Sequence, residues 1–343
     1  MRRSLAPLAV AAAMLRAAPA AADPMDLNLE RLGAPAGSIW LAINQQCVAA
    51  GKCTGVALSA GEAANLARES QQRYRTLAMQ LGLGLTAFVL DDPTTGGAVG
   101  FEFSLEAGQT AIRHPQAGAS PAPFGPAFAV WPVRGDDPSA LRTFALHVQK
   151  GLPYSFDVGG RLIYVDQSQM MAAQAELRWA LNENYGPAWL PDVALRGAYT
   201  RLLGQRDLTL GVIDFDAVFG KRFGVGGSVR LTPYGAVRFS MVAAQTTPID
   251  FGPTAGTCQT TTCFPDARSP GEALATTAPF ADVKYADHRI FRYAVGGKLN
   301  AGRFAMALEL TYYPGQRLEG HDQLAEVLLP DSLGGALRLG LDF

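Results

Sequence analysis

Apolar and polar residues alternate along the last nine positions of the chain. The apolar members fall on one parity: Leu337, Leu339, Leu341 and Phe343. The residues between them include both charges of the stretch, Arg338 and Asp342. Because successive side chains of a β-strand point to opposite faces, this pattern predicts a strand with one apolar face and one charged face.

The same alternation recurs along the chain after residue 80. It predicts strands at 81–89, 101–106, 144–149, 156–164, 171–181, 193–200, 208–219, 229–241, 291–299, 304–312 and 335–343. Within 208–219 the apolar parity changes near Val212 and Ile213, which predicts a β-bulge. One such segment alone fits the half-buried strand of a soluble sheet. The repeated set, with arginine on many polar faces, favours a barrel that has lipid outside and a charged, wet lumen inside.

The final strand, which ends on Phe343, resembles the C-terminal strand of bacterial outer-membrane β-barrel proteins. The resemblance implies an all-β fold, a transmembrane antiparallel β-barrel, located in the outer membrane after export through the periplasm. It also implies contact with outer-membrane lipid and recognition of the last strand by the barrel-assembly machinery. The signal residues would be Leu337, Leu339, Leu341 and Phe343. Such barrels have an even number of strands, so we expect about 12, with 10–14 possible, and 127–131 is the candidate for the strand that completes the set.

Residues 23–80 have helical rather than alternating patterns. Ser38 is a candidate cap for a first helix that runs toward Gly51. Ser59 and Glu62 match a capping box, which predicts a second helix to about Met79. So small a segment must pack against the barrel, either in the lumen as a plug or at the periplasmic rim. A helical segment before a barrel is similar in architecture to the fatty-acid transporter class, although the chain carries no motif of that family.

The N-terminus has the features of a secretory signal peptide. Arg2 and Arg3 precede a short apolar segment, and small residues follow before Asp23. The expected organisation is therefore a signal peptide at 1–22, a helical segment at 23–80 and a barrel at 81–343.

Composition agrees with an exported membrane protein. Hydrophobic residues make up 48% of the chain and charged residues 17%, below the roughly 25% of soluble proteins. The net charge of −1 and the scattered basic residues argue against a nucleic-acid partner. In an exported chain, the pairs Cys47/Cys53 and Cys258/Cys263 predict two local disulfides, with zinc as the alternative.

Loop lengths predict how the barrel faces, since periplasmic turns are short and external loops are long. The links at 150–153, 224–227 and 301–303 are expected on the periplasmic side. The segments 245–286 and 314–333 are expected outside. The link 182–191 is long for a periplasmic one, and its Tyr185 and Trp189 fit an interfacial aromatic belt.

The polar parity of the predicted strands assigns sixteen charged residues to the lumen. The acidic ones are Glu102, Glu106, Asp157, Glu176, Asp214, Asp216, Glu309 and Asp342. The basic ones are Arg161, Arg178, Arg196, Arg230, Arg238, Arg292, Lys298 and Arg338. This balance favours cross-strand ion pairs, whereas an unbalanced ring of arginine at one depth would make an anion-selective pore.

The expected function is passive or gated passage of a small solute across the outer membrane. The alternative is a structural or adhesin-like barrel that acts through its external loops. An enzyme is less expected, because no Gly-x-Ser-x-Gly motif is present and no histidine lies in a nucleophile motif (the histidines are His114, His147, His288 and His321). No cofactor and no metal site are predicted.

Overall fold

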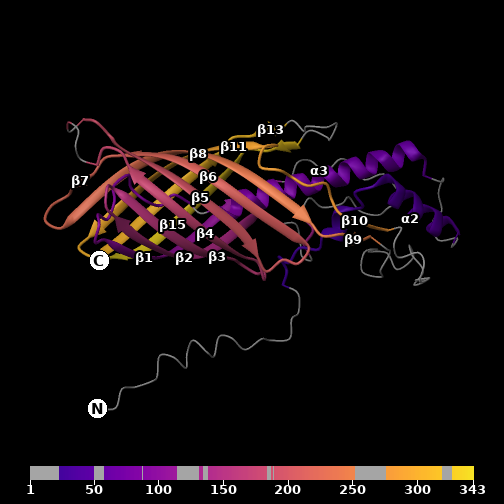
Figure 1. Cartoon of the computed structure of the whole chain (residues 1–343), viewed down its shortest axis with the longest axis horizontal. Helices are drawn as coiled ribbons and strands as arrows, with labels where there is room; N and C mark the ends of the chain where they lie inside the picture. The colour runs from indigo at the N-terminus through magenta and orange to yellow at the C-terminus, as the bar shows by residue number, and fades with distance from the viewer. Residues whose placement is uncertain are drawn as a thin grey trace, which may run out of the picture.

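Ten antiparallel strands close into a barrel (Figure 1). They are β1 (Phe101–Ala111), β2 (Ala140–Leu152), β3 (Phe156–Val165), β4 (Met171–Ala180), β5 (Asp192–Leu203), β6 (Leu208–Gly220), β8 (Val229–Thr246), β11 (Arg289–Ala301), β12 (Phe304–Tyr313) and β15 (Ser332–Asp342). The ring is complete because β1 pairs with β15 and β11 pairs with β8. The short β7 (Phe223–Gly224) pairs with β8 outside the ring.

The computed structural model describes residues 23–49, 58–86, 88–113, 131–133, 138–183, 187, 189–251, 276–318 and 327–343. The predicted signal peptide at 1–22 lies outside these residues. So do Cys53, Cys258 and Cys263, and with them both predicted disulfides and the zinc alternative.

The predicted strand at 81–89 is wrong. Residues 81–85 are the last turns of α3 (Ala60–Leu85), and the chain then continues into the lumen without regular structure. Leu81, Leu83 and Leu85 alternate with Gly82 and Gly84, but this end of the helix is buried on all sides. Because this end of the helix has no exposed face, its apolar residues need not recur with a 3.6-residue period. Its sequence can therefore show the two-residue alternation of a strand. The barrel therefore has ten strands rather than the expected 12, at the lower end of the expected range.

The candidate strand at 127–131 falls outside the described residues except for Trp131. That residue lies in no strand and is fully buried. Its indole Nε1 donates a hydrogen bond of 2.6 Å to Oε1 of Gln80 on α3.

The predicted bulge in β6 is also wrong. The pairing of β6 with β5 and with β8 runs through Val212 and Ile213 without a break in register. The apolar parity changes because Leu210 and Val212 point inward at this depth and join the core around α3, whereas Phe215 points outward and is 53% exposed. The lumen thus changes from apolar to polar along the strand.

The outside of the ring is an apolar surface. Every barrel strand exposes large hydrophobic side chains on its outward face. Leu105, Leu308 and Leu310 are between 59% and 60% exposed. Such a surface is unfavourable in water and is expected where lipid chains cover it. None of the helices in the described ranges is both long and apolar enough to span a membrane.

Two helices precede the barrel. α2 (Gly37–Ala49) begins one residue before Ser38, so Ser38 lies within the helix rather than capping it. The capping box at Ser59 is confirmed: its hydroxyl accepts from the Glu62 amide, and the Glu62 carboxylate accepts from the Ser59 amide. A short 3-10 helix, η1 (Leu29–Leu32), lies beside α3.

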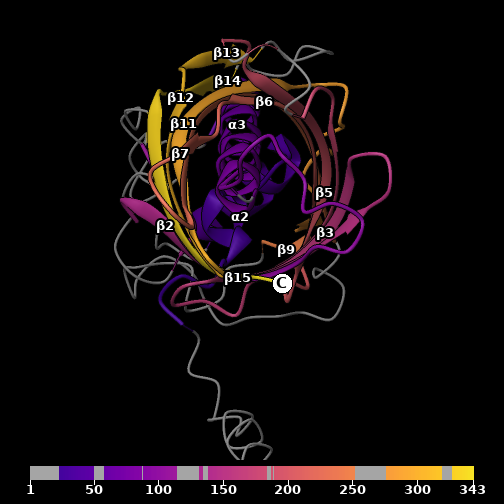
Figure 2. The ribbon, with the colours of Figure 1, turned by 90° about the vertical axis from the view of Figure 1, so that its left-hand side faces the viewer.

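Helix α3 enters the barrel and ends inside it, as the view along the barrel shows (Figure 2). Two glycines allow the helix to approach the wall closely. A Cβ at Gly82 would lie 3.0 Å from both Cγ atoms of Val242 on β8, and a Cβ at Gly84 would overlap Leu141 of β2. Around this part of the helix the lumen is filled by one apolar cluster to which α2, α3, η1 and the strand ends contribute.

The two mouths of the barrel differ. At the mouth where Phe343 lies, backbone hydrogen bonds join Phe101 to Phe343, Arg303 to Asp342 and Ser228 to Gly302. This mouth, called the C-terminal mouth below, therefore gathers the links at 153–155, 221–228 and 302–303, in agreement with the predicted grouping. The opposite mouth, called the loop mouth, carries the connections 112–139, 247–288 and 314–331.

Helix α2 and the first half of α3 lie beyond the loop mouth (Figure 1). Two small pairs of strands belong to the same end: β9 (Ile249–Asp250) with β10 (Thr277–Ala278), and β13 (Gln316–Leu318) with β14 (Val327–Leu329). In the connection that holds β10, Phe280 stacks on Tyr74 of α3 with ring centroids 4.7 Å apart.

Candidate functional site

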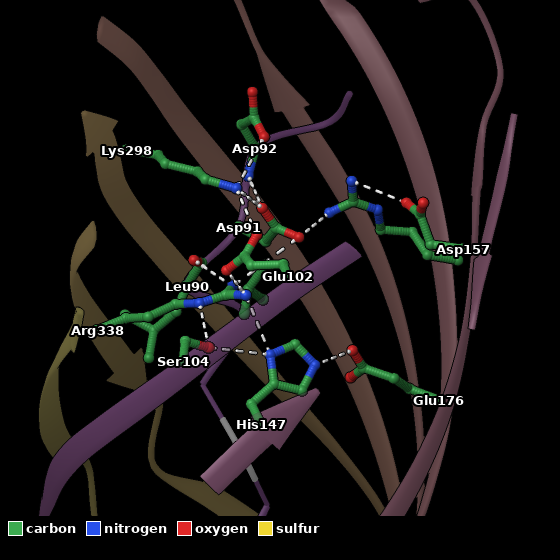
Figure 3. A network of polar contacts seen from close by, with 12 residues as sticks. Leu90, Asp91, Asp92, Glu102, Ser104, His147, Asp157, Glu176, Lys298 and Arg338 are labelled. Atoms are coloured by element: carbon green, nitrogen blue, oxygen red, sulfur yellow. Dashed lines mark hydrogen bonds and ion pairs between the residues drawn. The ribbon is translucent and has the colours of Figure 1, made fainter. Parts of the chain in front are cut away.

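The chain between α3 and β1 runs through the lumen and carries Asp91 to its centre (Figure 3). The Asp91 carboxylate accepts a hydrogen bond of 2.7 Å from Lys298 Nζ and forms a close ion pair with Arg178. Arg338 NH1 lies 3.9 Å from the same carboxylate and donates a 3.0 Å hydrogen bond to the carbonyl of Leu90. Three cations from β4, β11 and β15 therefore converge on one buried acid of the threaded segment.

Glu309 of β12 holds the backbone of the same segment. Its carboxylate accepts from the amides of Val89, at 3.2 Å, and Leu90, at 2.8 Å. The hydroxyl of Tyr234 donates to it at 2.9 Å. Because a buried amide without a partner is costly, this carboxylate is a specific support for an otherwise irregular backbone.

A second group of charges lies on the wall over β1 to β6. Arg161 Nε donates to both oxygens of Glu106 at 3.1 Å. Arg196 joins Glu176 to Asp216, with 2.7 Å to each carboxylate. The wall charges therefore neutralise one another in cross-strand pairs. This arrangement favours a closed, rigid lining rather than an unbalanced ring of arginine.

A third group meets the end of α3. Arg292 NH2 lies 2.8 Å from Asp214 Oδ1 and 2.8 Å from Ser240 Oγ. Its NH1 donates to the Thr86 hydroxyl and, at 3.5 Å, to the Leu83 carbonyl. A cation at the C-terminal end of a helix is favourable, since the last carbonyls there have no partners within the helix.

The structure places fourteen of the sixteen predicted lumen charges in the buried interior, and all of these lie in the groups above or next to them. Arg230 differs: it is exposed at the C-terminal mouth. Asp342 is half-buried at the same mouth and accepts a 2.6 Å hydrogen bond from Asn300. Sequence reasoning missed Asp91 and Asp92, because no alternation marks a segment that has neither helix nor strand.

The C-terminal strand presents its apolar parity to the outside, with Leu337, Leu339, Leu341 and Phe343 between 40% and 61% exposed. Their recognition by the barrel-assembly machinery stays a prediction. Among the other predicted features, Trp189 is 81% exposed in the link after β4, and Tyr185 lies outside the described residues. His114 and His321 also lie outside them, and His288 is buried.

Ser104, His147 and Glu176 form a chain of contacts with the composition of a hydrolytic triad (Figure 3). His147 Nδ1 lies 3.4 Å from Ser104 Oγ, and Nε2 lies 3.0 Å from Glu176 Oε1. However, Arg338 NH2 lies 3.0 Å from the same Nδ1, and Arg338 Nε donates to Ser104 Oγ at 2.9 Å. A guanidinium only donates, so it occupies the lone pair with which the imidazole would take the serine proton.

This occupancy makes the triad unfit for nucleophilic catalysis in the observed arrangement. Ser104 and His147 are also buried, 1% and 0% exposed, so a substrate has no route to the hydroxyl here. The three residues act as part of the polar lining. Among the described residues, no group of three His, Cys, Asp or Glu side chains is arranged to hold a metal ion.

Comparisons with known proteins find similarity among solved structures only, at low identity. No family model and no curated protein match the chain. Among solved structures, the N-terminal β-barrel domain of Pseudomonas aeruginosa OprF is 11% identical, with 72% of this chain and 99% of that chain covered and a TM-score of 0.24. The outer membrane protein OprG of the same organism is 7% identical (74% and 99% covered, TM-score 0.24).

The translocator domain of the autotransporter NalP from Neisseria meningitidis is 10% identical, with 81% of this chain and 97% of that chain covered and a TM-score of 0.34. These chains are similar to the present one in having a barrel. The closed ring of antiparallel strands, its apolar exterior and its polar interior identify the protein as a bacterial outer-membrane β-barrel.

Proposed function

We propose that the barrel is a membrane anchor that holds the part of its N-terminal segment (residues 23–85) lying beyond the lumen on the outer face of the cell. The observation that carries this proposal is the course of the chain. Residues 23–49 and the start of α3 lie at the loop mouth, and the chain then crosses the lumen to begin β1 at the C-terminal mouth. The working surface would comprise this part of the segment and the long connections around it.

The direction of the barrel in the membrane supports the outer location. External loops of such barrels are long and periplasmic turns are short. The three longest connections, 112–139, 247–288 and 314–331, are all at the loop mouth, although 166–170 and 204–207 there are short, whereas the longest link at the C-terminal mouth is 181–191. The periplasmic rim, one of the two positions expected for the helical segment, is therefore disfavoured.

The occupied lumen argues against a permanently open pore. Apolar packing around α3 fills the half near the loop mouth, and charge pairs around Asp91 fill the half near the C-terminal mouth. A ring of ten strands also encloses a much narrower interior than the 16 to 18 strands of open porins do. Passive passage of a solute does not fit this arrangement.

Cysteine labelling of whole cells tests the anchor proposal. In a background with all four native cysteines changed to serine, Asn65→Cys lies on an exposed part of α3. Arg206→Cys in the link after β5 reports the loop mouth, and Val225→Cys in the link before β8 reports the C-terminal mouth. We expect a membrane-impermeant maleimide to label the first two in intact cells and Val225→Cys only after the outer membrane is opened.

If Asn65→Cys is protected in intact cells and labelled only together with Val225→Cys, the segment lies in the periplasm and the proposal is wrong. Equal unfolding temperatures of the three variants and the serine background serve as the control for folding. If Arg206→Cys is also protected, the assignment of the loop mouth to the outside is wrong, whatever the position of the helix.

Gated passage of a small solute is the second candidate. The observation in its favour is that residues 88–95 lie outside the large apolar cluster around α3 and are held by charges, hydrogen bonds and two small apolar clusters, so this part of the lumen can open without dismantling the large one. Conductance across a planar bilayer, for the native protein beside Asp91→Asn, is the test. If neither the native protein nor the Asp91→Asn variant conducts under voltage, gated passage is wrong.

A further inference from the structure

A cavity of about 270 Å³ lies at the C-terminal mouth, between the threaded segment and the wall. The segment contributes residues from Asp91 to Gly100, and the wall contributes residues from β1, β2, β3, β4, β8, β11 and β15. Arg230 and Phe343 at its edge are exposed, so the cavity opens to water on this side. It is separate from the apolar cluster and from the loop mouth.

One side of the cavity is a row of oxygen acceptors on neighbouring strands. Asp342 of β15 pairs in register with Glu102 of β1, and Glu102 pairs in register with Gln149 of β2. Asp157 of the next strand, β3, lies opposite Gly151, two residues from Gln149. Four adjacent strands thus present carbonyl or carboxylate oxygens at one depth.

Some of these oxygens lack a hydrogen-bond donor. Gln149 is 7% exposed and its Oε1 has no partner, and Oδ1 of Asp342 has none either. Asp157, which is 2% exposed, differs: it is contacted by Arg178 at 3.2 Å, by the Gln149 side chain and by the Gly96 backbone amide. Buried acceptors normally have donors, so their convergence on a water-filled cavity marks a place for a ligand that donates.

The lining has five acidic side chains (Asp91, Asp92, Glu102, Asp157 and Asp342) and four basic ones, of which three are already engaged; the fourth, Arg230, is exposed at the edge. Lys298 lies 2.7 Å from Asp91 and 3.1 Å from Glu102. Arg178 pairs with Asp91, and Arg222 donates to the Thr94 hydroxyl and lies 3.7 Å from Asp92. The remaining demand in the cavity is therefore for hydrogen-bond donors and positive charge.

We propose that this cavity binds a small organic cation through its N–H groups, as a primary ammonium or guanidinium compound would offer. The acceptors are spread along the wall rather than gathered round one point, and within the described residues they form no metal-binding group. The volume is below the roughly 300 Å³ at which pockets for drug-sized ligands begin, so the ligand is small. Because the mouth faces the periplasm on the loop-length argument, the ligand comes from that side.

Calorimetric titration of the refolded full-length protein in detergent tests the proposal, with putrescine as the probe. Putrescine carries two ammonium groups with N–H donors. Tetramethylammonium is the matched control, because it carries positive charge without any donor, and inorganic phosphate is the control for an anion site. We expect saturable binding of putrescine, and at least tenfold weaker binding of tetramethylammonium.

Two variants at the acceptor row and one at the basic side locate the site. Gln149→Met and Asp342→Asn keep the size of the side chain and are each expected to weaken putrescine binding about tenfold, as the loss of a hydrogen bond to a charged donor would. Arg222→Gln removes a cation from the opposite side of the cavity and is expected to tighten putrescine binding. Unfolding temperatures within a few degrees of the native protein establish that the variants fold.

Three results would overturn the proposal. Equal binding of putrescine and tetramethylammonium would indicate charge attraction without hydrogen bonding to specific acceptors. Phosphate binding that Arg222→Gln abolishes would make the cavity an anion site. Absence of saturable putrescine binding in folded protein would leave only water in the cavity. None of these outcomes bears on which side of the membrane residues 23–85 occupy, so this test is independent of the anchor proposal.

Discussion

Replacing Asp91 by asparagine tests whether charge holds the threaded segment in the lumen. The aspartate is 5% exposed and compensates Arg178 and Lys298, with Arg338 at a longer distance. Asparagine has nearly the same size and keeps one carbonyl acceptor. The substitution therefore removes one negative charge from beside three buried cations, which keep their contacts with Glu102 and Asp157.

The size of the effect follows from this geometry. Removing one partner of a buried ion pair costs about 3–5 kcal/mol, because the other charge stays buried without compensation. Asparagine retains one acceptor, so the lower end, about 3 kcal/mol, applies. Since 1.4 kcal/mol corresponds to a factor of ten, the ratio of closed to open lumen is expected to fall by about 100-fold.

Planar-bilayer recordings of refolded protein measure this ratio as the fraction of time spent in conducting steps. Asp92→Asn is the matched control, since its ion-pair contacts, to Arg222 and Lys298, are both 3.7 Å long and Arg222 is 29% exposed. The pair with Arg222 is partly hydrated and contributes up to about 1 kcal/mol, and the buried pair with Lys298 is too long for a hydrogen bond, so this variant is expected to change the ratio much less than Asp91→Asn does. If the Asp91→Asn variant folds and conducts no more than the native protein, the reasoning is refuted. Apolar packing of α3 would then suffice to close the lumen.

Three further predictions concern α3, the backbone of the segment and the buried serine. Gly84→Ala is expected to destabilise the protein by about 1–3 kcal/mol because Leu141 must move, whereas Gly61→Ala, with open space around it, should be neutral or stabilising; thermal unfolding compares them, and equal effects would contradict the close packing. Glu309→Gln should cost about 1–3 kcal/mol and speed amide exchange in 88–95, measured by mass spectrometry; unchanged exchange would show that other contacts hold this backbone. A fluorophosphonate reagent should leave Ser104 unmodified, and a covalent adduct there would revive the hydrolase interpretation.

Much of the barrel follows from alternation because its two faces meet different surroundings. Lipid outside and charge inside impose a two-residue period on ten strands, and the sequence carries that period plainly. The two-residue period disappears where a strand has the same surroundings on both of its faces. Near the loop mouth the wall is apolar outside and apolar inside, so the change of parity at Val212 looked like a bulge although the ladder is regular.

The lumen charges were predictable as a set, but their partners were not. Parity places Arg178 and Lys298 inside without stating their depth or what fills the space between them. The partner they share, Asp91, belongs to a segment that takes its conformation from the wall rather than from its own sequence. The same holds for His147: its inward direction follows from parity, while the arginine that occupies its Nδ1 comes from the far end of the chain.

The seam between β1 and β15 constrains the order of events during assembly. Phe101 and Phe343 exchange two backbone hydrogen bonds there, of 3.1 Å and 2.8 Å, so the ring cannot close until the last residues have been synthesised. The second half of α3 and residues 88–95 are enclosed by the ring, so we expect them to lie among the open strands when closure occurs. Release afterwards would require reopening the seam or drawing a helix through the ring. The residence time of the segment is therefore expected to match the lifetime of the barrel, however weak its individual contacts are.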